Sequence, residues 1–89
     1  MPVRPEPGLM ATVLADGYLE LFSERTGTRF RCSPVGTAMW IALRQHDGDV
    51  DAAADMLAEL WDRKPENMRA DMGVWLDELR DAGLVHNER

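Results

Sequence analysis

The sequence predicts an α+β domain in a winged-helix-like arrangement, in which a three-stranded antiparallel sheet is followed by a three-helix bundle. Two observations predict this fold class. Polar and apolar residues alternate between residues 9 and 33 and are interrupted by glycine-containing turns, which is typical of a β-meander. From residue 35 the apolar residues recur with the helical period, in three segments that glycine or proline separates.

The first two expected strands are Leu9–Leu14 and Tyr18–Phe22. The Asp16-Gly17 pair between them is a strong turn signal, because glycine adopts the positive φ that tight hairpin turns need. Leu19 and Leu21 fall on one face of the second strand, since side chains alternate across a strand. These residues predict a hairpin whose second strand contributes to the core.

The third expected strand, Thr28–Ser33, follows a second glycine turn. It places Phe30 and Cys32 on one face and Arg29 and Arg31 on the other. A short antiparallel meander leaves outer strands whose main-chain N–H and C=O groups are unpaired. A groove between such a strand and the third helix is therefore plausible.

Each expected helix has recognisable ends. Ser33-Pro34 begins the first helix, because serine caps an N-terminus and proline has a preset φ. This helix ends near His46, Asp49 caps the second, Pro65 begins the third and Gly83 caps its C-terminus. The expected apolar faces are Val35, Met39, Trp40 and Leu43, then Val50, Ala53, Ala54, Leu57, Leu60 and Trp61, then Met68, Met72, Trp75, Leu76 and Leu79.

The chain is expected to form one domain over residues 9–85, with Leu84-Val85 folded back onto the core. Residues 1–8 contain three prolines and a glycine and predict an extended or disordered lead-in. Residues 86–89 are expected to be a frayed tail. A chain of 89 residues is near the lower end of what folds alone, so its core has to be economical.

The amino-acid composition indicates the cellular compartment of the protein. Cys32 is the single cysteine, so no internal disulfide forms, and a lone thiol fits a reducing cytoplasm. No stretch approaches the roughly 18 apolar residues of a membrane span, and prolines stand where a signal peptide needs an apolar run. We expect a cytoplasmic protein that does not act at a membrane.

Charge is distributed unevenly. The chain has a net charge of −6, and residues 35–89 hold twelve acidic against six basic side chains, while residues 1–34 are balanced. An acidic surface repels phosphate, so nucleic acid is disfavoured as a partner. Arg25, Arg29 and Arg31 form the one local basic cluster.

No pattern typical of catalysis or of a metal or cofactor site is found. His46 and His86 are forty residues apart and have no ligand partners at metal-binding spacing. Cys32 has no obvious base partner and is expected to be buried and inert. The sequence predicts no enzyme and no cofactor.

The order and spacing of these elements resemble the PqqD-like fold, the RiPP recognition element of pathways that make ribosomally synthesised, post-translationally modified peptides. The resemblance covers about Leu9 to Val85. It rests on Asp16-Gly17, Gly27, Phe30-x-Cys32-Ser33-Pro34-Val35-Gly36, Ala38–Ile41, Gly48-Asp49, Asp71, Leu76, Leu79 and Gly83-Leu84-Val85. Within the family, the short length, the helix start with Trp40 and the AGLV tail look similar to the separate leader-binding proteins of lasso-peptide biosynthesis.

The resemblance implies a non-catalytic adaptor that binds the leader of a precursor peptide as a further β-strand, antiparallel to the third strand. It implies that a separate leader-cleaving cysteine protease, and a cyclase after it, act on the captured peptide. Lasso leaders of this type present a tyrosine, a proline and a leucine, so an aromatic and apolar groove is expected. The expected peptide-binding residues are Thr28, Arg29, Phe30, Arg31, Cys32, Ser33, Met68, Asp71, Met72 and Trp75.

Each of these assignments has a structural alternative. Phe30, Met72 and Trp75 fit the core as well as a groove, because apolar residues at strand or helical spacing usually close a domain. Arg29 and Arg31 fit a role as solvated charges that guard a strand edge from aggregation. Asp71 fits acceptance of a hydrogen bond from the peptide or from a neighbouring arginine, or plain exposure.

Function also has alternatives. A winged-helix DNA-binding regulator has the right outline, but the third helix carries five acidic and two basic residues, a balance of −3. A subunit that docks a partner protein through its acidic helices, and a PqqD-type chaperone of another modified-peptide pathway, are also compatible with the sequence.

Overall fold

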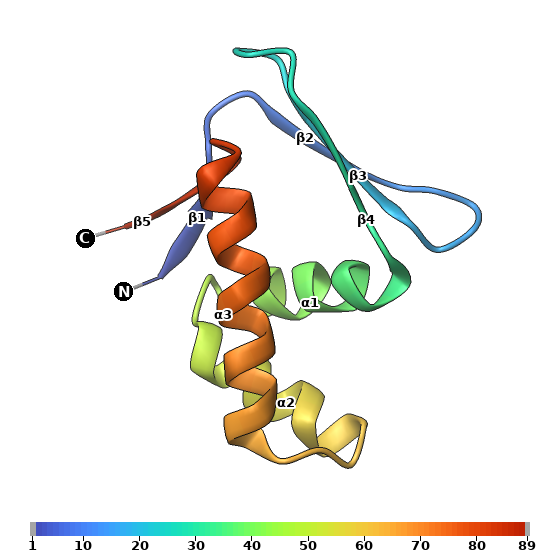
Figure 1. The fold of residues 1–89 in the computed structure, drawn as a ribbon, viewed down its shortest axis with the longest axis vertical. Helices are drawn as coiled ribbons and strands as arrows, with labels where there is room; N and C mark the ends of the chain where they lie inside the picture. The colour runs from blue at the N-terminus through green and yellow to red at the C-terminus, as the bar shows by residue number, and fades with distance from the viewer. Residues whose placement is uncertain (1, 89) are drawn as a thin grey trace.

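The structure, a computed structural model, describes residues 2–88 and is shown in Figure 1. In chain order its elements are β1 (Val3–Pro5), β2 (Leu9–Val13), β3 (Leu19–Ser23), β4 (Arg29–Cys32), α1 (Pro34–Gln45), α2 (Val50–Leu60), α3 (Pro65–Asp81) and β5 (Val85–Asn87). The α+β class is confirmed, with the three-stranded antiparallel sheet ahead of the three helices. A small second sheet, formed by β1 and β5, was not expected from the sequence.

The three-stranded sheet has the order β2-β3-β4, so β3 is central and the other two strands are edges. Its register aligns Leu21 with Ala11 on one side and with Phe30 on the other. Leu19 and Leu21 are 1% and 0% exposed, so this row of side chains forms the inner face of the sheet. The alternation predicted for β3 and β4 is therefore present.

The helices bury most of the core. Ser33 caps the N-terminus of α1, and its hydroxyl accepts a hydrogen bond from the Gly36 N–H at 3.4 Å. Asp49 caps α2 in the same way, accepting from the Ala52 N–H at 3.1 Å. α3 starts at Pro65 without a side-chain cap. The buried apolar residues of the three helices are Met39, Trp40, Ala42, Leu43, Ala53, Ala54, Leu57, Ala58, Met68, Met72, Trp75, Leu76 and Leu79.

Two residues assigned to apolar helix faces are exposed. Val35 is 54% exposed, because Gly36 and Thr37 take the inward positions of the first turn of α1. The Thr37 hydroxyl donates to the carbonyl of Gly17 at 2.9 Å, which ties α1 to the β2–β3 turn. Leu60 is 70% exposed. It precedes the half-buried Trp61 and is therefore rotated about 100° from it around the helix axis.

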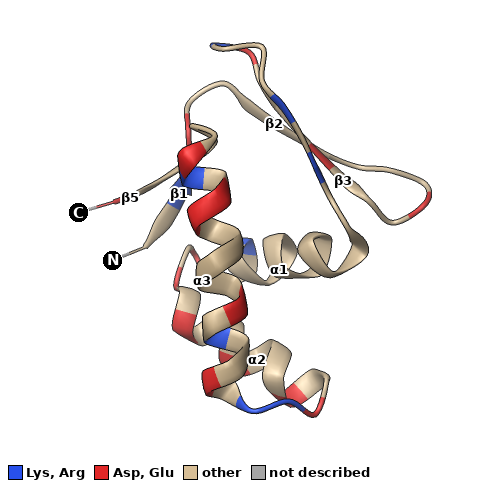
Figure 2. Ribbon diagram, in the orientation of Figure 1, with Lys and Arg blue, Asp and Glu red and all other residues tan. Residues whose placement is uncertain are grey.

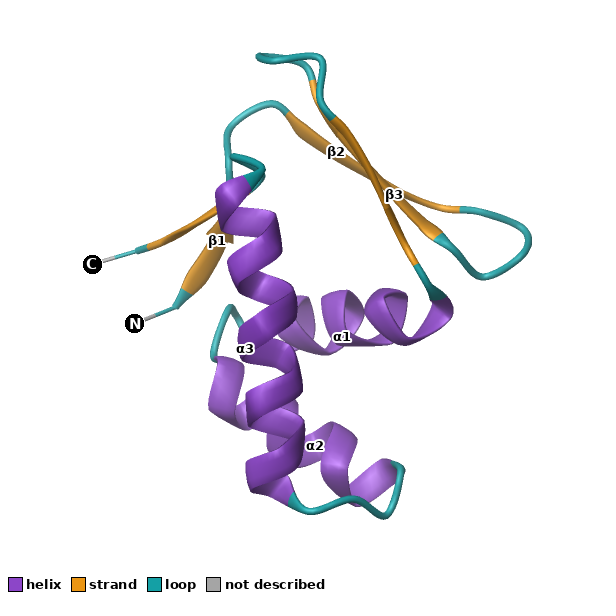
Figure 3. Cartoon of the chain, viewed as in Figure 1, coloured by secondary structure: helices purple, strands orange, loops and turns teal. Residues whose placement is uncertain are grey.

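The ends of the chain are part of the domain. Within the lead-in expected over residues 1–8, residues 3–5 are extended, but they are paired within the domain, because β1 pairs antiparallel with β5. The expectation of a frayed tail over 86–89 is wrong for the described residues for the same reason. Val3 is 4% exposed and belongs to the core. Figure 3 shows this small sheet on the opposite side of α3 from the β2–β4 sheet. Residues 1 and 89 lie outside the described part.

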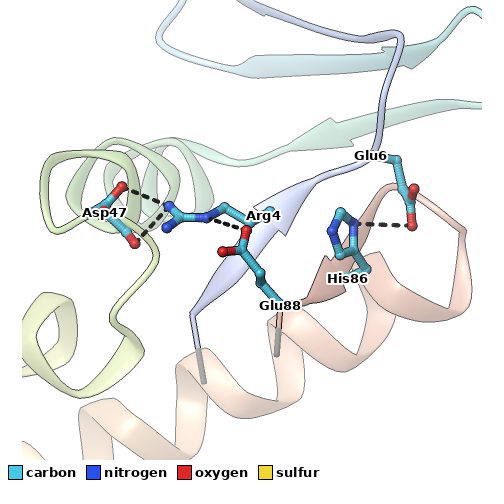
Figure 4. Close-up of polar contacts among 5 residues, drawn as sticks. All are labelled: Arg4, Glu6, Asp47, His86 and Glu88. Carbon is cyan, nitrogen blue, oxygen red and sulfur yellow. Dashed lines mark hydrogen bonds and ion pairs between the residues drawn. The ribbon is translucent and has the colours of Figure 1, made fainter.

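A polar cluster fastens this second sheet to the helices, and we call Arg4, Asp47 and Glu88 the terminal clasp (Figure 4). Arg4 Nη1 donates to Asp47 Oδ1 at 2.7 Å and to the Asp47 carbonyl at 2.8 Å, and Arg4 Nε donates to Glu88 Oε2 at 3.0 Å. The Val3 N–H also donates to the carbonyl of Gly48 at 2.9 Å. The α1–α2 turn is thereby held against β1.

Candidate functional site

The outer edge of β4 offers main-chain groups that the sheet does not use. The Ser23 N–H donates to the carbonyl of Thr28, the residue that precedes β4, at 2.9 Å. Because bonded and non-bonded pairs alternate in an antiparallel ladder, Phe30 and Cys32 exchange hydrogen bonds with β3. The N–H and C=O groups of Arg29 and Arg31 therefore point to the free edge.

The two faces of β4 have different chemistry. Phe30 is half-buried and packs against the core, and Cys32 is 3% exposed, both on the inner face. Arg29 and Arg31 occupy the outer face, where both side chains are more than half exposed. A strand added beside β4 would therefore direct alternate side chains toward an apolar face and toward an arginine-bearing face.

Both arginines of β4 already have partners within the domain. Arg29 Nη1 lies 2.6 Å from Glu20 Oε1, and its guanidinium stacks 4.7 Å from the Phe22 ring centroid. Arg31 Nη2 lies 2.9 Å from Asp16 Oδ2, and its guanidinium stacks 4.5 Å from the ring centroid of Tyr18. Sequence reasoning missed these partners. In the register Glu20 stands opposite Arg31, but its carboxylate pairs diagonally with Arg29. An incoming acidic residue would compete with intramolecular ion pairs.

The lower end of β4 meets α1 and α3 at a buried junction of Cys32, Gly36 and Trp75. A Cβ built on Gly36 would lie 2.9 Å from Cys32 Cβ and 3.3 Å from Trp75 Nε1. Burial raises the pKa of the Cys32 thiol, and the adjacent Trp75 indole N–H opposes that shift. Trp75 Nε1 is itself buried and has no hydrogen-bond partner among residues 2–88. The helical glycine after Ser33-Pro34 was the sequence signal for this close approach.

The predicted site residues of α3 differ in accessibility. Met68 and Met72 are 0% exposed and Trp75 is 9% exposed, so the methionine side chains lie in the core and are not open to a peptide in this arrangement. Asp71 is exposed, and its Oδ2 accepts a hydrogen bond from Arg63 Nη2 at 2.7 Å, so a neighbouring arginine is its partner in this structure. Thr28 is half-buried and Ser33 is exposed, one residue before and after β4.

Charge is concentrated on the helices. Figure 2 shows acidic residues along α3, with few basic ones between them. Several of the acids are paired, Asp77 with Arg80 at 2.6 Å and Asp55 with Arg69 at 2.6 Å. Over residues 2–88, no group of three potential metal ligands is found. None of the described helices is long and apolar enough to cross a membrane.

The fold and the free edge of β4 define a small winged-helix-like domain with an open strand. A family described as Coenzyme PQQ synthesis protein D (PqqD) matches residues 20–85, and the chain belongs to this family. The match starts within β3 and includes β4 and all three helices. The resemblance stated from the sequence is confirmed at the level of the family.

A solved structure described as TbiB1 in complex with the TbiA(beta) leader peptide has the same fold. The two chains superpose with a TM-score of 0.84 at 17% sequence identity, over 97% of this chain and 98% of the other. At this identity the likeness concerns the fold alone. Among curated proteins, none matches the sequence of this chain.

Proposed function

We propose that this protein is a non-catalytic adaptor that binds the leader segment of a precursor peptide by adding it as a strand to β4. The observation that carries the proposal is the free edge of β4, where Arg29 and Arg31 present unused main-chain donors and acceptors. Membership of the PqqD family supports it, as does the shared fold of TbiB1, which was solved with a leader peptide.

The bound segment runs antiparallel to β4 and pairs its main chain with Arg29 and Arg31. Hydrogen bonds to these groups fix the register of the peptide, whatever its side chains. Residues opposite Phe30 and Cys32 direct their side chains to the inner face, toward Phe30 and the accessible part of Trp75. The tyrosine and leucine of a lasso-type leader suit this face. Thr28 and Ser33 flank the paired stretch.

Sequence choice on the outer face depends on the two arginines. Arg29 and Arg31 hold Glu20 and Asp16 in exposed ion pairs, which are weak and exchange readily. An acidic leader residue replaces one of these carboxylates at small cost. Asp71 of α3 stays paired with Arg63 of the α2–α3 connection and helps to position that helix, and Met68 and Met72 support the inner face from within the core.

The adaptor raises the effective concentration of the precursor peptide near the processing enzyme and forms or breaks no covalent bond itself. A leader held with micromolar to nanomolar affinity, roughly −8 to −12 kcal/mol, keeps the cleavage region near a separate cysteine protease. A cyclase then closes the ring of the lasso product. We propose that the acidic helices are the surface that docks the protease, which would need a basic patch of its own to match them.

The test separates main-chain pairing from side-chain contact at one position. Arg31→Pro removes the N–H that faces the free edge without removing a hydrogen bond to β3, whereas Arg31→Ala removes the side chain and keeps the N–H. The probe is a fluorescein-labelled lasso leader peptide with tyrosine, proline and leucine, titrated by anisotropy. Arg31→Pro is expected to weaken binding about tenfold, near the upper value of one lost hydrogen bond of about 0.5–1.5 kcal/mol, and Arg31→Ala about threefold or less.

Equal loss in both variants would place recognition on the arginine side chain and contradict strand addition. Circular dichroism of each variant confirms that the domain is folded. Labelled duplex DNA is titrated in parallel at two salt concentrations. DNA binding with a steep salt dependence, and none of the peptide, would overturn the adaptor proposal in favour of a winged-helix regulator.

A further inference from the structure

The sheet has a second free edge, on β2, opposite the edge proposed for the leader peptide. Two hydrogen bonds bracket this strand: the Leu14 N–H donates to the Tyr18 carbonyl at 2.7 Å, and the Glu24 N–H donates to the Gly8 carbonyl at 3.1 Å. The alternation of the ladder then assigns Met10 and Thr12 to bonded pairs with β3.

The odd-numbered residues of β2 consequently turn their main chain outward. Ala11 and Val13 present both N–H and C=O to the free edge. Leu9 presents its C=O, because its N–H donates to the Glu6 carbonyl at 3.1 Å. These groups repeat at the spacing that a further antiparallel strand needs.

Unlike β4, the edge of β2 carries no protection. The strand LMATV has no charged residue and no proline, which are the usual means of keeping an edge from pairing. Met10 is 51% and Val13 is 56% exposed, on opposite faces of the strand. Val13 is exposed although its neighbour in the register, Leu19, is 1% exposed. The sheet therefore extends beyond the core that the helices cover.

We propose that β2 pairs antiparallel with β2 of a second copy of this chain, about a two-fold axis at Ala11. Self-pairing fits the strand, because its outward groups are complementary under that symmetry. Ala11 exchanges both hydrogen bonds with the partner subunit's Ala11. Each Val13 N–H donates to the C=O of the partner's Leu9, and the two small sheets become one.

The side chains match under the same symmetry. Leu9 lies opposite the partner's Val13 on the inner face and Ala11 lies opposite its own copy, so apolar groups meet apolar groups. Met10 lies opposite the partner's Thr12 on the outer face. The net charge of −6 on each chain opposes association, but none of it stands on the paired strands. A single strand pair buries less than about 1,200 Å², which is the range of weak and reversible association.

The dimer leaves β4 free, because β3 separates the two edges. The inference therefore stands independently of the proposed leader binding. A dimer that binds no leader would leave this inference intact, and a monomer that binds leader would overturn this inference alone.

Sedimentation velocity of the full chain tests the pairing, from about 10 µM to about 1 mM, the range expected for weak association. The average mass of the wild type is expected to rise toward that of two chains. Val13→Lys, which places a charge on the edge, and Ala11→Pro, which removes an outward N–H without touching the bonds to β3, are expected to keep the single-chain mass throughout.

The matched control is Val74→Lys, which makes the same change of charge at a 63% exposed valine of α3. It is expected to associate as the wild type does. A wild type that stays at single-chain mass over the whole range, or a Val13→Lys variant that associates as strongly as the control, would overturn the inference. Circular dichroism confirms that each variant is folded.

Discussion

The indole nitrogen of Trp75 and the side chain of Cys32 converge beside Gly36, so the middle of α3, the end of β4 and the start of α1 meet at one point. A Cβ on Gly36 would lie within 3.3 Å of both residues. Within the described part of the chain Trp75 Nε1 has no hydrogen-bond partner, and unpaired buried polar groups are uncommon. The position of the β4 edge relative to α3 therefore depends on this junction.

The burial of Trp75 changes what its substitution tests. If Trp75 served only to contact the peptide, as its place among the expected peptide-binding residues implies, Trp75→Ala would weaken leader binding while the domain stayed folded. A tryptophan that is 9% exposed contributes to the core, and truncation to alanine costs about 3–5 kcal/mol. That is a large part of the roughly 5–15 kcal/mol that holds a domain together. Loss of stability is the first expected effect of Trp75→Ala, measured by urea unfolding.

Trp75→Phe is the sharper variant for binding. It leaves a smaller cavity than Trp75→Ala and removes an N–H that has no partner, so a smaller loss of stability is expected. Anisotropy titration with the labelled leader then compares a folded variant with the wild type. If the leader affinity of Trp75→Phe equals that of the wild type in a stable fold, Trp75 is a core residue without a part in recognition.

Substitution by alanine is expected to have opposite effects on stability at two helical glycines. Gly36→Ala places a Cβ at 2.9 Å from Cys32 Cβ, closer than two carbon atoms pack, so it is expected to destabilise the domain by about 1–3 kcal/mol. Gly73→Ala meets nothing within 4 Å in α3 and is expected to stabilise it by about 0.5–1 kcal/mol. Urea midpoints of the two variants check the difference. A stabilising Gly36→Ala would show that the junction is loosely packed.

The sequence predicts the central sheet and the helices well because each has a local signal. Gly17 and Gly27 have positive φ at 87° and 74°, as the turns require, and Ser33 and Asp49 cap the helices that follow them. Such signals involve neighbours a few residues apart. These signals can therefore be recognised in the sequence without knowledge of the tertiary structure.

The β1–β5 sheet and the accessibility of the site were beyond the sequence. β1 has three residues, one of them a proline, and is too short to show an alternating polar and apolar pattern. Its partner strand lies at the other end of the chain. Met68 and Met72 follow the same helical spacing whether they face a groove or the core. Only the tertiary packing of α3, chiefly against α2, decides between these two environments, and it buries both methionines.

The terminal clasp predicts how acid acts on the fold. The hydrogen bond from Arg4 lowers the pKa of Asp47 below its ordinary value, with the arginine charge adding to the effect (Figure 4). A carboxyl whose pKa is lowered by folding stabilises the fold fully above its ordinary pKa, near pH 4, and loses this contribution as the pH falls through the lower, folded value. The clasp is thus expected to be intact at pH 7 and to open below about pH 4.

Arg4→Ala removes this contribution together with the Arg4 hydrogen bonds to Glu88 and to the Asp47 carbonyl. Arg44→Ala is the control, because it removes an arginine charge near Asp47 without removing any of these hydrogen bonds. Urea midpoints are measured from about pH 7 to about pH 2.5, a range that spans the titration of aspartate. Arg4→Ala is expected to be less stable than the wild type at pH 7, and the difference is expected to narrow below pH 4, because protonated Asp47 no longer attracts Arg4. Added salt is expected to narrow it at pH 7 as well, since Asp47 is exposed. A difference that stays constant with pH and salt would mean that Arg4 supports β1 through packing of its aliphatic stem, and the ion pair would then have no part in joining β1 to the α1–α2 turn.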